Sequence, residues 1–430
     1  MSTFPEYANL DLAGIHKAVL AKWKQSHLFE QTLVARKDAE PWIFFEGPPS
    51  ANGLPGIHHV MGRSLKDVFC RYKTQKGFLV DRKAGWDTHG LPVELGVEKE
   101  LGITKEDIGK SITIEEYNNA CRTAVMRYTG IWKDLTDQMG YWVDMDKPYV
   151  TYEPKYMESV WWLLAQLYKK GLIYKGYTIQ PYSPKAGTGL SSHELNQPGC
   201  YQNVKDNTVV AQFKMINNGQ SEALFGAATV HFLAWTTTPW TLPTNFALAV
   251  GPNIEYAVVA GHLLAKSLVG AHAKELGFES ADDAVAAIER TVMGQALAGL
   301  RYERIFDFYA DESKFDVANA WQVLVDDYVG EGDGTGIVHQ APAYGEDDQR
   351  VCEAAGIPVY VSINERGEFN SVVSEFEGQH VFDANKNIIA WLKANGRLFK
   401  QASYDHPYPH CYRCKNPLIY KAVSSWFVET

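Results

Sequence analysis

The chain has 430 residues, 46% of them hydrophobic and 21% charged, and its formal net charge is −10. This composition is close to the globular average and excludes a disordered, collagen-like or coiled-coil protein. No apolar run reaches the roughly 18–20 residues of a membrane span, and the N-terminus lacks the basic and apolar regions of a secretory signal. The six cysteines do not form a disulfide framework. We therefore expect a cytoplasmic protein without membrane association and, at roughly 100–200 residues per domain, two to four domains.

The first part of the chain has the order of elements that a parallel α/β sheet requires. Apolar periodicity predicts helices over residues 10–28 and 57–76, and strands over residues 42–45 and 78–80. A turn rich in Gly and Pro separates the first strand from the second helix. A later helix, over residues 156–170, carries an apolar face that we expect in the core: Met157, Val160, Trp161, Leu164 and Leu167. Strand, turn, helix and strand make one βαβ unit, whose ligands lie beyond the carboxyl ends of its strands.

Beyond residue 176 the pattern becomes β-rich. Short strands are predicted over residues 208–215, 229–235, 256–260 and 336–340, and helices over residues 281–297 and 347–355. Gly, Asn and Pro clusters separate these elements. We interpret residues 195–400 as a separate β-rich domain with a few helices, inserted into the α/β fold.

Two segments beside the predicted strands have the composition of a ligand site. Residues 47–59, Gly-Pro-Pro-Ser-Ala-Asn-Gly-Leu-Pro-Gly-Ile-His-His, lead from a strand into a helix. Glycines let a ligand approach the backbone, the helix N-terminus favours negative charge, and imidazoles donate to phosphate oxygens. Residues 85–94, Gly-Trp-Asp-Thr-His-Gly-Leu-Pro-Val-Glu, place an Asp where it could hold an ammonium group. Neither segment is a Walker loop or a G-x-G-x-x-G fingerprint, which disfavours a dinucleotide-binding domain.

A basic stretch follows the first of these segments. Residues 63–83 contain seven Lys and Arg against two Asp. On charge alone this is a solvated helix face, and the functional alternative is a local basic patch for nucleic acid.

The two segments together resemble isoleucyl-tRNA synthetase, a class I aminoacyl-tRNA synthetase. Two later segments resemble the editing domain of that family: Trp-Thr-Thr-Thr-Pro-Trp-Thr-Leu-Pro-Thr-Asn at residues 235–245 and Gly-Thr-Gly-Ile-Val-His-Gln-Ala-Pro-Ala-Tyr-Gly-Glu-Asp-Asp at residues 334–348. Tyr-Pro-His-Cys-Tyr-Arg-Cys at residues 408–414 extends the resemblance over nearly the whole chain in family order.

The resemblance implies both a fold and an activity. The fold would be the first half of a class I Rossmann-like nucleotide-binding domain, over residues 1–194, with an inserted β-rich α+β editing domain over residues 195–400 and a return segment over residues 401–430. The activity would be ATP-dependent activation of isoleucine, its transfer to tRNA(Ile), and hydrolysis of misattached valine. Isoleucine, tRNA(Ile) and ATP with Mg²⁺ would be the substrates, and the enzyme would be a monomer.

The synthetic site is carried over residue by residue. The resemblance assigns Pro48 to the amino-acid pocket, Asp87 to the substrate ammonium group, and His59 to the last histidine of a His-Ile-Gly-His motif that stabilises developing charge. The full set comprises His58 and His59 as catalytic residues, with Gly47, Pro48, Asn52, Gly53, Asp87 and His89 for substrate and ATP. Gly56 stands where the first histidine of the motif belongs and His58 where its glycine belongs, so His58 is expected to supply the missing imidazole or to stack on the base.

The editing domain answers a discrimination problem for which this family is itself the standard example. One methylene is worth only about 1–3 kcal/mol in an apolar pocket, so a second site must hydrolyse the smaller product. The resemblance implies a pocket lined by Thr236, Thr237, Thr238 and Asn245, with His339 restricting its size and Asp348 holding the ammonium group. Without the resemblance, the threonines are ordinary strand residues and Asp348 is part of an acidic first turn of a helix.

The remaining motif is a cysteine pair, Cys411 and Cys414, with half the ligands of a zinc site. Relatives that bind zinc there supply a second pair from a Cys-Pro-x-Cys stretch, which here reads Ser183-Pro184-Lys185-Ala186. His406 or His410 could contribute, but we expect a reduced, metal-free turn.

The Lys-Met-Ser-Lys-Ser loop of class I synthetases does not occur in this sequence. We therefore expect the N-terminal part of a longer enzyme, with half a synthetic site. Two alternatives stay open: a trans-acting editing deacylase that docks tRNA through residues 63–83, and a valyl- or leucyl-type synthetase.

Overall fold

The computed structural model describes residues 9–430 and divides into two compact units. Unit 1 runs to residue 173 and includes residue 430, and unit 2 comprises residues 174–429. Residues 1–8, part of the segment in which we expect no secretory signal, lie outside the described residues. None of the helices in the described part of the chain is long and apolar enough to cross a membrane.

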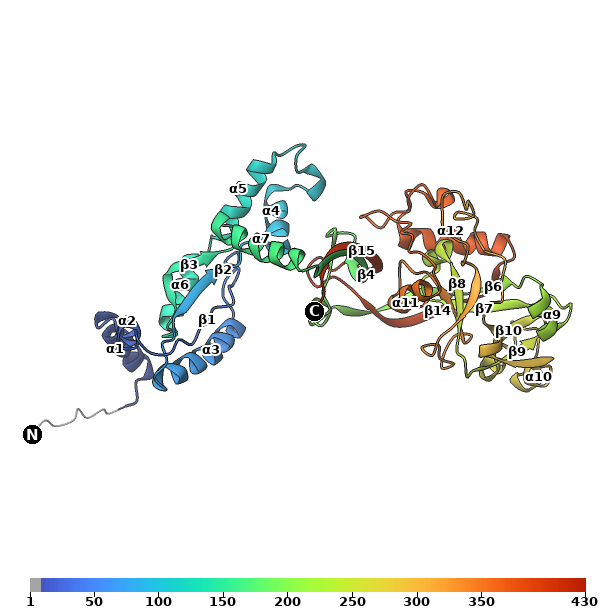
Figure 1. Ribbon diagram of the computed structural model, residues 1–430, viewed down its shortest axis with the longest axis horizontal. Coiled ribbons are helices and arrows are strands. Elements are labelled where there is room, and N and C mark those ends of the chain that lie inside the picture. The colour runs from blue at the N-terminus through green and yellow to red at the C-terminus, as the bar shows by residue number, and fades with distance from the viewer. Residues whose placement is uncertain (1–8) are drawn as a thin grey trace, which may run out of the picture. The chain divides into compact units, whose positions relative to one another are not determined.

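Unit 1 is an α/β unit around a small parallel sheet (Figure 1). Its elements are α1 (Leu12–Gln25), α2 (Leu28–Val34), β1 (Phe44–Phe45), α3 (Ile57–Gln75), β2 (Arg82–Trp86), α4 (Leu91–Leu101), η1 (Lys105–Asp107), α5 (Ile114–Val125), α6 (Thr129–Gln138), β3 (Asp144–Val150) and α7 (Pro154–Lys169). The strands pair in the order β1-β2-β3, all parallel, with Phe44 opposite Arg82. The predicted βαβ unit is therefore confirmed.

The predicted helices and strands of unit 1 are found with two shifts. The first helix breaks at His27, whose left-handed backbone (φ 49°) separates α1 from α2. The second strand begins at Arg82 rather than at residue 78, although Leu79 still bridges to Pro41 in parallel. The helices predicted over residues 57–76 and 156–170 are α3 and α7.

One prediction for unit 1 is wrong. The apolar face of α7 does not lie in the core: no residue of this helix is buried, and Trp161 is 65% exposed. Apolar periodicity shows that a helix has a face to bury, but no element of unit 1 covers this one.

Unit 2 is β-rich (Figure 1). Its helices are α8 (Ser192–Leu195), α9 (Gly219–Phe225), α10 (Ala281–Ala286), α11 (Glu346–Ala354) and α12 (Val381–Ala394), with short 3₁₀ helices η2 (Pro239–Thr244), η3 (Lys266–Leu268), η4 (Gly270–His272), η5 (Gly294–Leu297) and η6 (Ser374–Phe376). Its strands are β4 (Ile173–Ser183), β5 (Thr188–Gly189), β6 (Tyr201–Lys214), β7 (His231–Thr236), β8 (Ala247–Val250), β9 (Glu255–Val259), β10 (His262–Ala265), β11 (Arg290–Met293), β12 (Gln322–Val325), β13 (Ile337–Gln340), β14 (Leu398–Pro409) and β15 (Ile419–Val428).

Most strands of unit 2 belong to one mixed sheet in the order β11-β9-β10-β7-β13-β8-β12, with β6 joining β7 to β14. Strand β7 runs parallel to β13, with Trp235 opposite Val338, so the two strands end at the same edge. The largest core cluster lies between the sheet and α12, whose residues Ala384, Ile388 and Leu392 repeat at helical spacing and are fully buried.

The strands predicted in unit 2 correspond to β6, β7, β9 and β13, and the helix over residues 347–355 to α11. The helix predicted over residues 281–297 is wrong beyond Ala286. There the β-branched Thr291 and Val292 pair antiparallel with β9 instead. Helix α12 was not predicted.

The chain enters and leaves the large sheet along paired strands. Strand β4 lies beside β15, and residues 201–211 of β6 pair antiparallel with residues 398–409 of β14 (Figure 1). Because of these two pairings, the segments that precede and follow residues 212–397 lie side by side.

Candidate functional site

The first group of predicted site residues lies at the N-terminus of α3. The main-chain N–H of Gly56 donates to Nδ1 of the half-buried His59 at 2.8 Å, and the His59 ring packs edge-on against Trp132 at 4.7 Å. Burial and the neighbouring His58 and Arg63 hold the pKa of His59 below its ordinary value of 6.5. A neutral imidazole that accepts at Nδ1 carries its proton on Nε2. His59 therefore presents an N–H donor at the positive end of a helix dipole.

The glycine at position 56, where the family motif has its first histidine, has a local explanation. A Cβ atom at Gly56 would lie 2.8 Å from Cε1 and 3.0 Å from Nδ1 of His58, so the His58 ring occupies the space that a side chain at position 56 would fill. The two imidazole rings lie 3.8 Å apart between centroids. The structure thus brings His58 and His59 together at the helix start.

The loop before α3 is attached to the end of β2. The main-chain N–H of Asp87 donates to the carbonyl of Pro49 at 3.1 Å, which places the half-buried Asp87 next to the Gly-Pro-Pro segment. The main-chain N–H of His89 donates to the Asp87 carboxylate at 3.3 Å, and the His89 ring contacts the Thr151 hydroxyl at 2.9 Å. Further along the loop, the carbonyl of Gly53 accepts from the Trp132 indole at 2.9 Å.

A buried carboxylate that the sequence prediction missed holds this loop at its base. Glu46 is 3% exposed and accepts from Lys66 Nζ at 2.6 Å and from the Tyr141 hydroxyl. The Tyr149 hydroxyl donates to the Glu46 main-chain oxygen at 2.6 Å, and the Tyr149 ring crosses β2 directly over Gly85, where a Cβ would lie 2.3 Å from it. Only the position of Glu46 directly before the Gly-Pro-Pro segment could have indicated this role.

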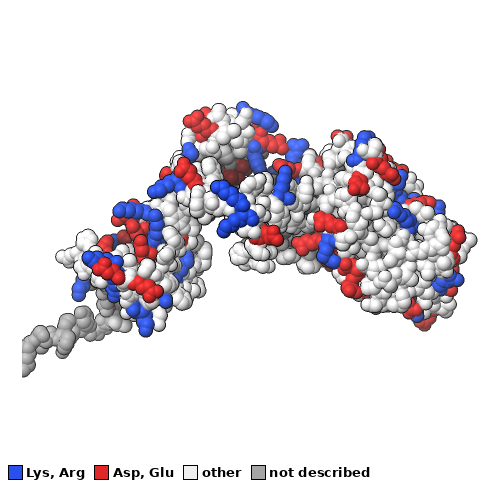
Figure 2. All heavy atoms as spheres, in the orientation of Figure 1, with Lys and Arg blue, Asp and Glu red and all other residues white. Residues whose placement is uncertain are grey.

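Three arginines of the basic stretch at residues 63–83 belong neither to a solvated face nor to an open docking surface, whereas Lys76 and Lys83 are exposed. Arg82 is fully buried and Arg63 is 5% exposed, hydrogen-bonded to Thr136 at 2.6 Å. Arg71 is paired with Asp67. These three arginines make contacts within unit 1. For them, both interpretations of the basic stretch are wrong. On the face shown in Figure 2, Lys and Arg are interspersed with Asp and Glu.

The second group of predicted residues lies at the edge where β7 and β13 end. Thr236 closes β7, and its hydroxyl lies 3.2 Å from that of Thr238 and accepts from the Thr238 N–H at 3.0 Å. Thr237 and Thr238 are half-buried, and Asn245 is 6% exposed at the end of η2. His339 is the third residue of β13 and is buried.

Hydrogen bonds engage both ring nitrogens of His339. Asn245 Nδ2 lies 3.0 Å from Nδ1, and the Thr241 hydroxyl lies 2.9 Å from Nε2. Burial lowers the pKa of His339 to about 3, so the ring is neutral. A neutral ring with both nitrogens hydrogen-bonded has no lone pair left for proton transfer.

Asp348 lies in the first turn of α11, immediately beyond β13. One carboxylate oxygen accepts from the main-chain N–H of Ala341 at 2.8 Å. Burial, together with the nearby Asp347 carboxylate, raises the pKa of Asp348 to about 7 despite this bond. The ion pairs of this turn belong to Arg350, which binds Asp347 and Asp326. Asp348 is thus a carboxyl group whose charged form lacks compensation.

The cysteine pair does not fit a zinc ion. Cys411 and Cys414 are free, and no group of three or more His, Cys, Asp or Glu in the described part of the chain could hold a metal. His406 pairs with Asp206 at 3.0 Å instead. Ser183 stands where zinc-binding relatives have a cysteine, and its Oγ lies 3.5 Å from Cys414 Sγ.

Sequence reasoning also missed Thr241 and Tyr302. Thr241 lies within the threonine-rich segment, three residues after Thr238, and only the structure shows its contact with His339. Tyr302 donates to Asn245 from 57 residues away, a contact that no local pattern signals.

Comparison with known proteins decides the family. A sequence model described as tRNA synthetases class I (I, L, M and V) matches residues 18–430. The chain belongs to this family. The fold class predicted from the sequence, a class I synthetase α/β fold with a β-rich α+β part, is confirmed by this match, by the parallel sheet of unit 1 and by the mixed sheet of unit 2.

Individual relatives carry more specific names. Proteins named isoleucine–tRNA ligase from Bacteroides fragilis and Porphyromonas gingivalis are 49% and 48% identical to this synthetase chain over 99% of its length, and one from Leifsonia xyli is 48% identical over 96%. The chain spans 42% of the length of the first two and 39% of the third. A solved ternary complex of Agrobacterium radiobacter K84 LeuRS with tRNA and LeuAMS aligns with 95% of this chain and 51% of its own, at 16% identity and a TM-score of 0.32, too weak a likeness to support a conclusion.

Proposed function

We propose that this chain is part of an isoleucine–tRNA ligase that activates isoleucine with ATP, transfers it to tRNA(Ile), and hydrolyses misattached valine. Support comes from relatives of that name at 45–49% identity over 96–99% of the chain. The observation that carries the editing activity is Asp348, a carboxyl group without an ion-pair partner that is held to the main chain just beyond β13, the strand of the buried, neutral His339.

In the synthetic half, we assign the α3 N-terminus to the phosphates of ATP. The helix dipole and the Nε2–H of His59 offer positive potential and a hydrogen-bond donor to negative charge that develops during adenylate formation. His58 would supply the imidazole that Gly56 lacks, since its ring fills that space. Gly47, Asn52 and Gly53 would let the nucleotide approach the loop closely.

The amino acid would bind between the loop and the end of β2. Asp87 would receive the substrate ammonium group while Pro48 lines the side-chain pocket, because the Asp87–Pro49 backbone bond holds these residues together. His89, fixed by Thr151, would bound the same pocket. Mg²⁺ would arrive with ATP, since the described residues offer no metal cluster of their own.

In the editing half, we assign the pocket to Thr236, Thr237, Thr238, Asn245, His339 and Asp348. The ammonium group of a misattached valine would compensate the Asp348 carboxylate, and binding would therefore lower its pKa. His339 would exclude larger side chains as a fixed wall rather than act as a base. We further propose that residues 195–400 form this inserted domain, that residues 1–194 and 401–430 belong to the catalytic domain, and that the enzyme is a cytoplasmic monomer.

The test compares hydrolysis of valyl-tRNA(Ile) with that of isoleucyl-tRNA(Ile) by the chain and by Asp348→Ala. We expect selective release of valine by the chain and loss of that activity or selectivity in the variant. Release of both amino acids at equal rates would contradict the assignment. Isoleucine-dependent exchange of pyrophosphate into ATP should be weak or absent, because the Lys-Met-Ser-Lys-Ser loop is not part of this sequence.

A trans-acting deacylase is the second candidate, favoured by the extensive core of unit 2. It predicts that the full-length native protein hydrolyses valyl-tRNA(Ile) without catalysing pyrophosphate exchange. A panel of isoleucine, valine and leucine in the exchange reaction separates the valyl- and leucyl-type alternatives.

A further inference from the structure

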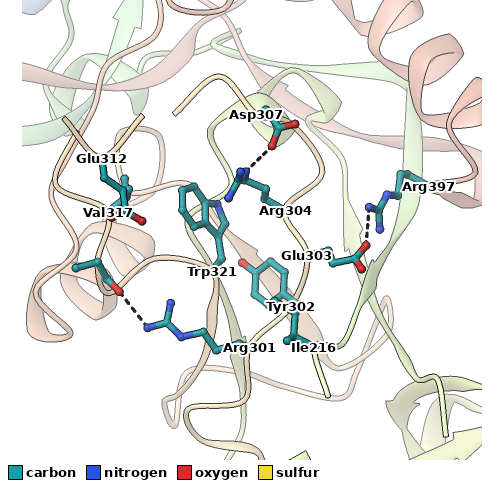
Figure 3. A pocket seen from close by; sticks show the side chains of 11 residues that line it. Ile216, Arg301, Tyr302, Glu303, Arg304, Asp307, Glu312, Val317, Trp321 and Arg397 are labelled. Carbon is teal, nitrogen blue, oxygen red and sulfur yellow. Dashed lines mark hydrogen bonds and ion pairs between the residues drawn. The ribbon is translucent and has the colours of Figure 1, made fainter. Parts of the chain in front are cut away.

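Unit 2 contains a solvent-open cavity of about 500 Å³ (Figure 3). Its three arginines are already paired: Arg304 with Asp307, Arg397 with Glu303, and Arg301 with main-chain carbonyls at 2.9 and 3.0 Å. The cavity is therefore not built as an anion site. Its aromatic wall is the part of the cavity that contacts a predicted editing residue, Asn245.

Two aromatic residues of that wall, Tyr302 and Trp321, are seen in Figure 3, and both hydrogen-bond Asn245. The Trp321 indole N–H donates to the main-chain oxygen of Asn245 at 3.1 Å. The Tyr302 hydroxyl donates to Asn245 Oδ1 at 2.8 Å. Tyr302 is 1% exposed, so water cannot replace this bond.

The Tyr302 bond gives the following hydrogen bonds a direction. Because Oδ1 of Asn245 accepts from Tyr302, Nδ2 faces the opposite way and donates to Ala247 O at 2.9 Å and to His339 Nδ1 at 3.0 Å. His339 then carries its proton on Nε2 and donates to the Thr241 hydroxyl at 2.9 Å. Thr241 in turn donates to the carbonyl of Thr238 at 2.8 Å, within the threonine segment.

We propose that Tyr302 is a positioning residue of the editing pocket: its hydroxyl sets the amide orientation of Asn245 and, through it, the tautomer of His339. The proposal rests on the proposed editing function for its consequence, but the tautomer exists independently of any activity. Tyr302 touches no reacting group and acts through Asn245.

Removal of the hydroxyl leaves Asn245 Oδ1 buried without a donor. Rotation of the amide group brings Oδ1 to His339, which then donates from Nδ1 and accepts at Nε2 from Thr241. Thr241 thereby releases the Thr238 carbonyl. Because Ala247 O still favours the original amide orientation, a mixed population is expected rather than complete reversal.

The experiment uses the complete chain labelled with ¹⁵N-histidine and long-range ¹H–¹⁵N correlation spectra, with the His339 signal assigned from His339→Gln. The unaltered chain should show His339 as the Nε2–H tautomer. Tyr302→Phe should show a measurable Nδ1–H population. Tyr256→Phe is the matched control, since its equally buried hydroxyl donates to Gly336 O at 2.7 Å and contacts no site residue.

The tautomer decides the proposal. An Nδ1–H tautomer in the unaltered chain overturns it even if Tyr302→Phe does not fold, as does a Tyr302→Phe spectrum identical to that of Tyr256→Phe. In deacylation of valyl-tRNA(Ile), Tyr302→Phe should lower kcat on the order of tenfold with KM unchanged, the scale of one buried hydrogen bond. Absence of deacylation by the unaltered chain would instead count against the proposed function and leave the spectroscopic result to decide the role of Tyr302.

Discussion

The two units bury their residues by different means. In unit 2, a mixed sheet and α12 enclose a continuous apolar core that includes Phe232, Leu248 and Ile388, all fully buried. In unit 1, the apolar clusters are small, and the fully buried Arg82 and nearly buried Glu46 and Arg63 take their place among the interior side chains. Unit 2 is held by apolar packing, whereas unit 1 depends on hydrogen-bonded charges.

The difference follows from the sheets. A parallel sheet is normally covered on both faces, and unit 1 has three short parallel strands whose flanking helices keep apolar residues in water. Along α3 the exposed apolar residues recur at helical spacing: Ile57, Met61, Leu65, Phe69 and Tyr72. Contiguous exposed apolar surface marks an interaction face. The scaffold of unit 1 is therefore incompletely covered, whereas that of unit 2 is complete.

The largest expected effect is on independent folding. Residues 174–429 expressed alone should unfold in one cooperative thermal transition, because their core is internal to them. Residues 1–173 expressed alone should bind hydrophobic dyes and lack a cooperative transition, as measured by circular dichroism. Cooperative unfolding of the first fragment would show that the hydrogen-bonded charges of unit 1 suffice.

A matched pair of leucines measures the same difference within the intact chain. Leu248→Ala in β8 should lower the free energy of unfolding by about 2–5 kcal/mol, because Leu248 is fully buried. Leu65→Ala in α3 should change it by less than about 0.5 kcal/mol, because Leu65 is 65% exposed. Urea denaturation supplies both values, and equal losses would contradict the assignment of an uncovered face to α3.

Asp348 should make the stability of unit 2 fall as pH rises. Between the ordinary carboxyl pKa of 3.8 and about 7, the folded chain keeps a proton that the unfolded chain has released. By linkage, the free energy of unfolding then decreases with pH across this interval. Asp348→Asn should remove the decrease and stabilise the chain at pH 8 by on the order of 1–2 kcal/mol, with little change at pH 4.

The control for this variant is Asp383→Asn, an exposed carboxylate in the first turn of α12. It should leave the pH dependence of urea denaturation unchanged. If Asp348→Asn has the same slope as the unaltered chain, Asp348 is not the uncompensated carboxyl group described above.

The smallest expected effect is that of a chelator, which should not change the melting temperature of the chain. The two turns that would carry a zinc site are nevertheless alike: the Ala186 N–H bonds to Ser183 Oγ at 3.2 Å and the Cys414 N–H to Cys411 Sγ at 3.4 Å. Ser183→Cys combined with Ala186→Cys should supply four thiolates and bind Co²⁺ with the absorption of tetrahedral sulfur ligation. Chelator-induced destabilisation of the unaltered chain would contradict a metal-free turn.

Sequence reasoning succeeded where a local pattern carried the information. The βαβ unit, α3, α11 and four strands of unit 2 followed from periodicity and from Gly and Pro positions. It failed for the helix beyond Ala286, because residues 290–293 pair with β9 instead, and for the face of α7, because periodicity does not reveal whether a partner exists. For Arg63 and Arg82 the interpretation of the basic stretch is wrong for a related reason: residue type does not show whether an arginine is buried.

For the sites, the sequence by itself determined the chemistry available. It specified the Gly-Pro loop and its histidines, the threonine segment, His339 and Asp348, because these residues stand in short, ordered motifs. The tertiary structure alone decided how they are connected. Parallel pairing of β7 and β13 brings Thr236 and His339 to one edge, and Tyr302 fixes Asn245 from 57 residues away. Hydrogen bonds between distant segments depend on packing, which is a property of the whole fold and not of any local stretch of sequence.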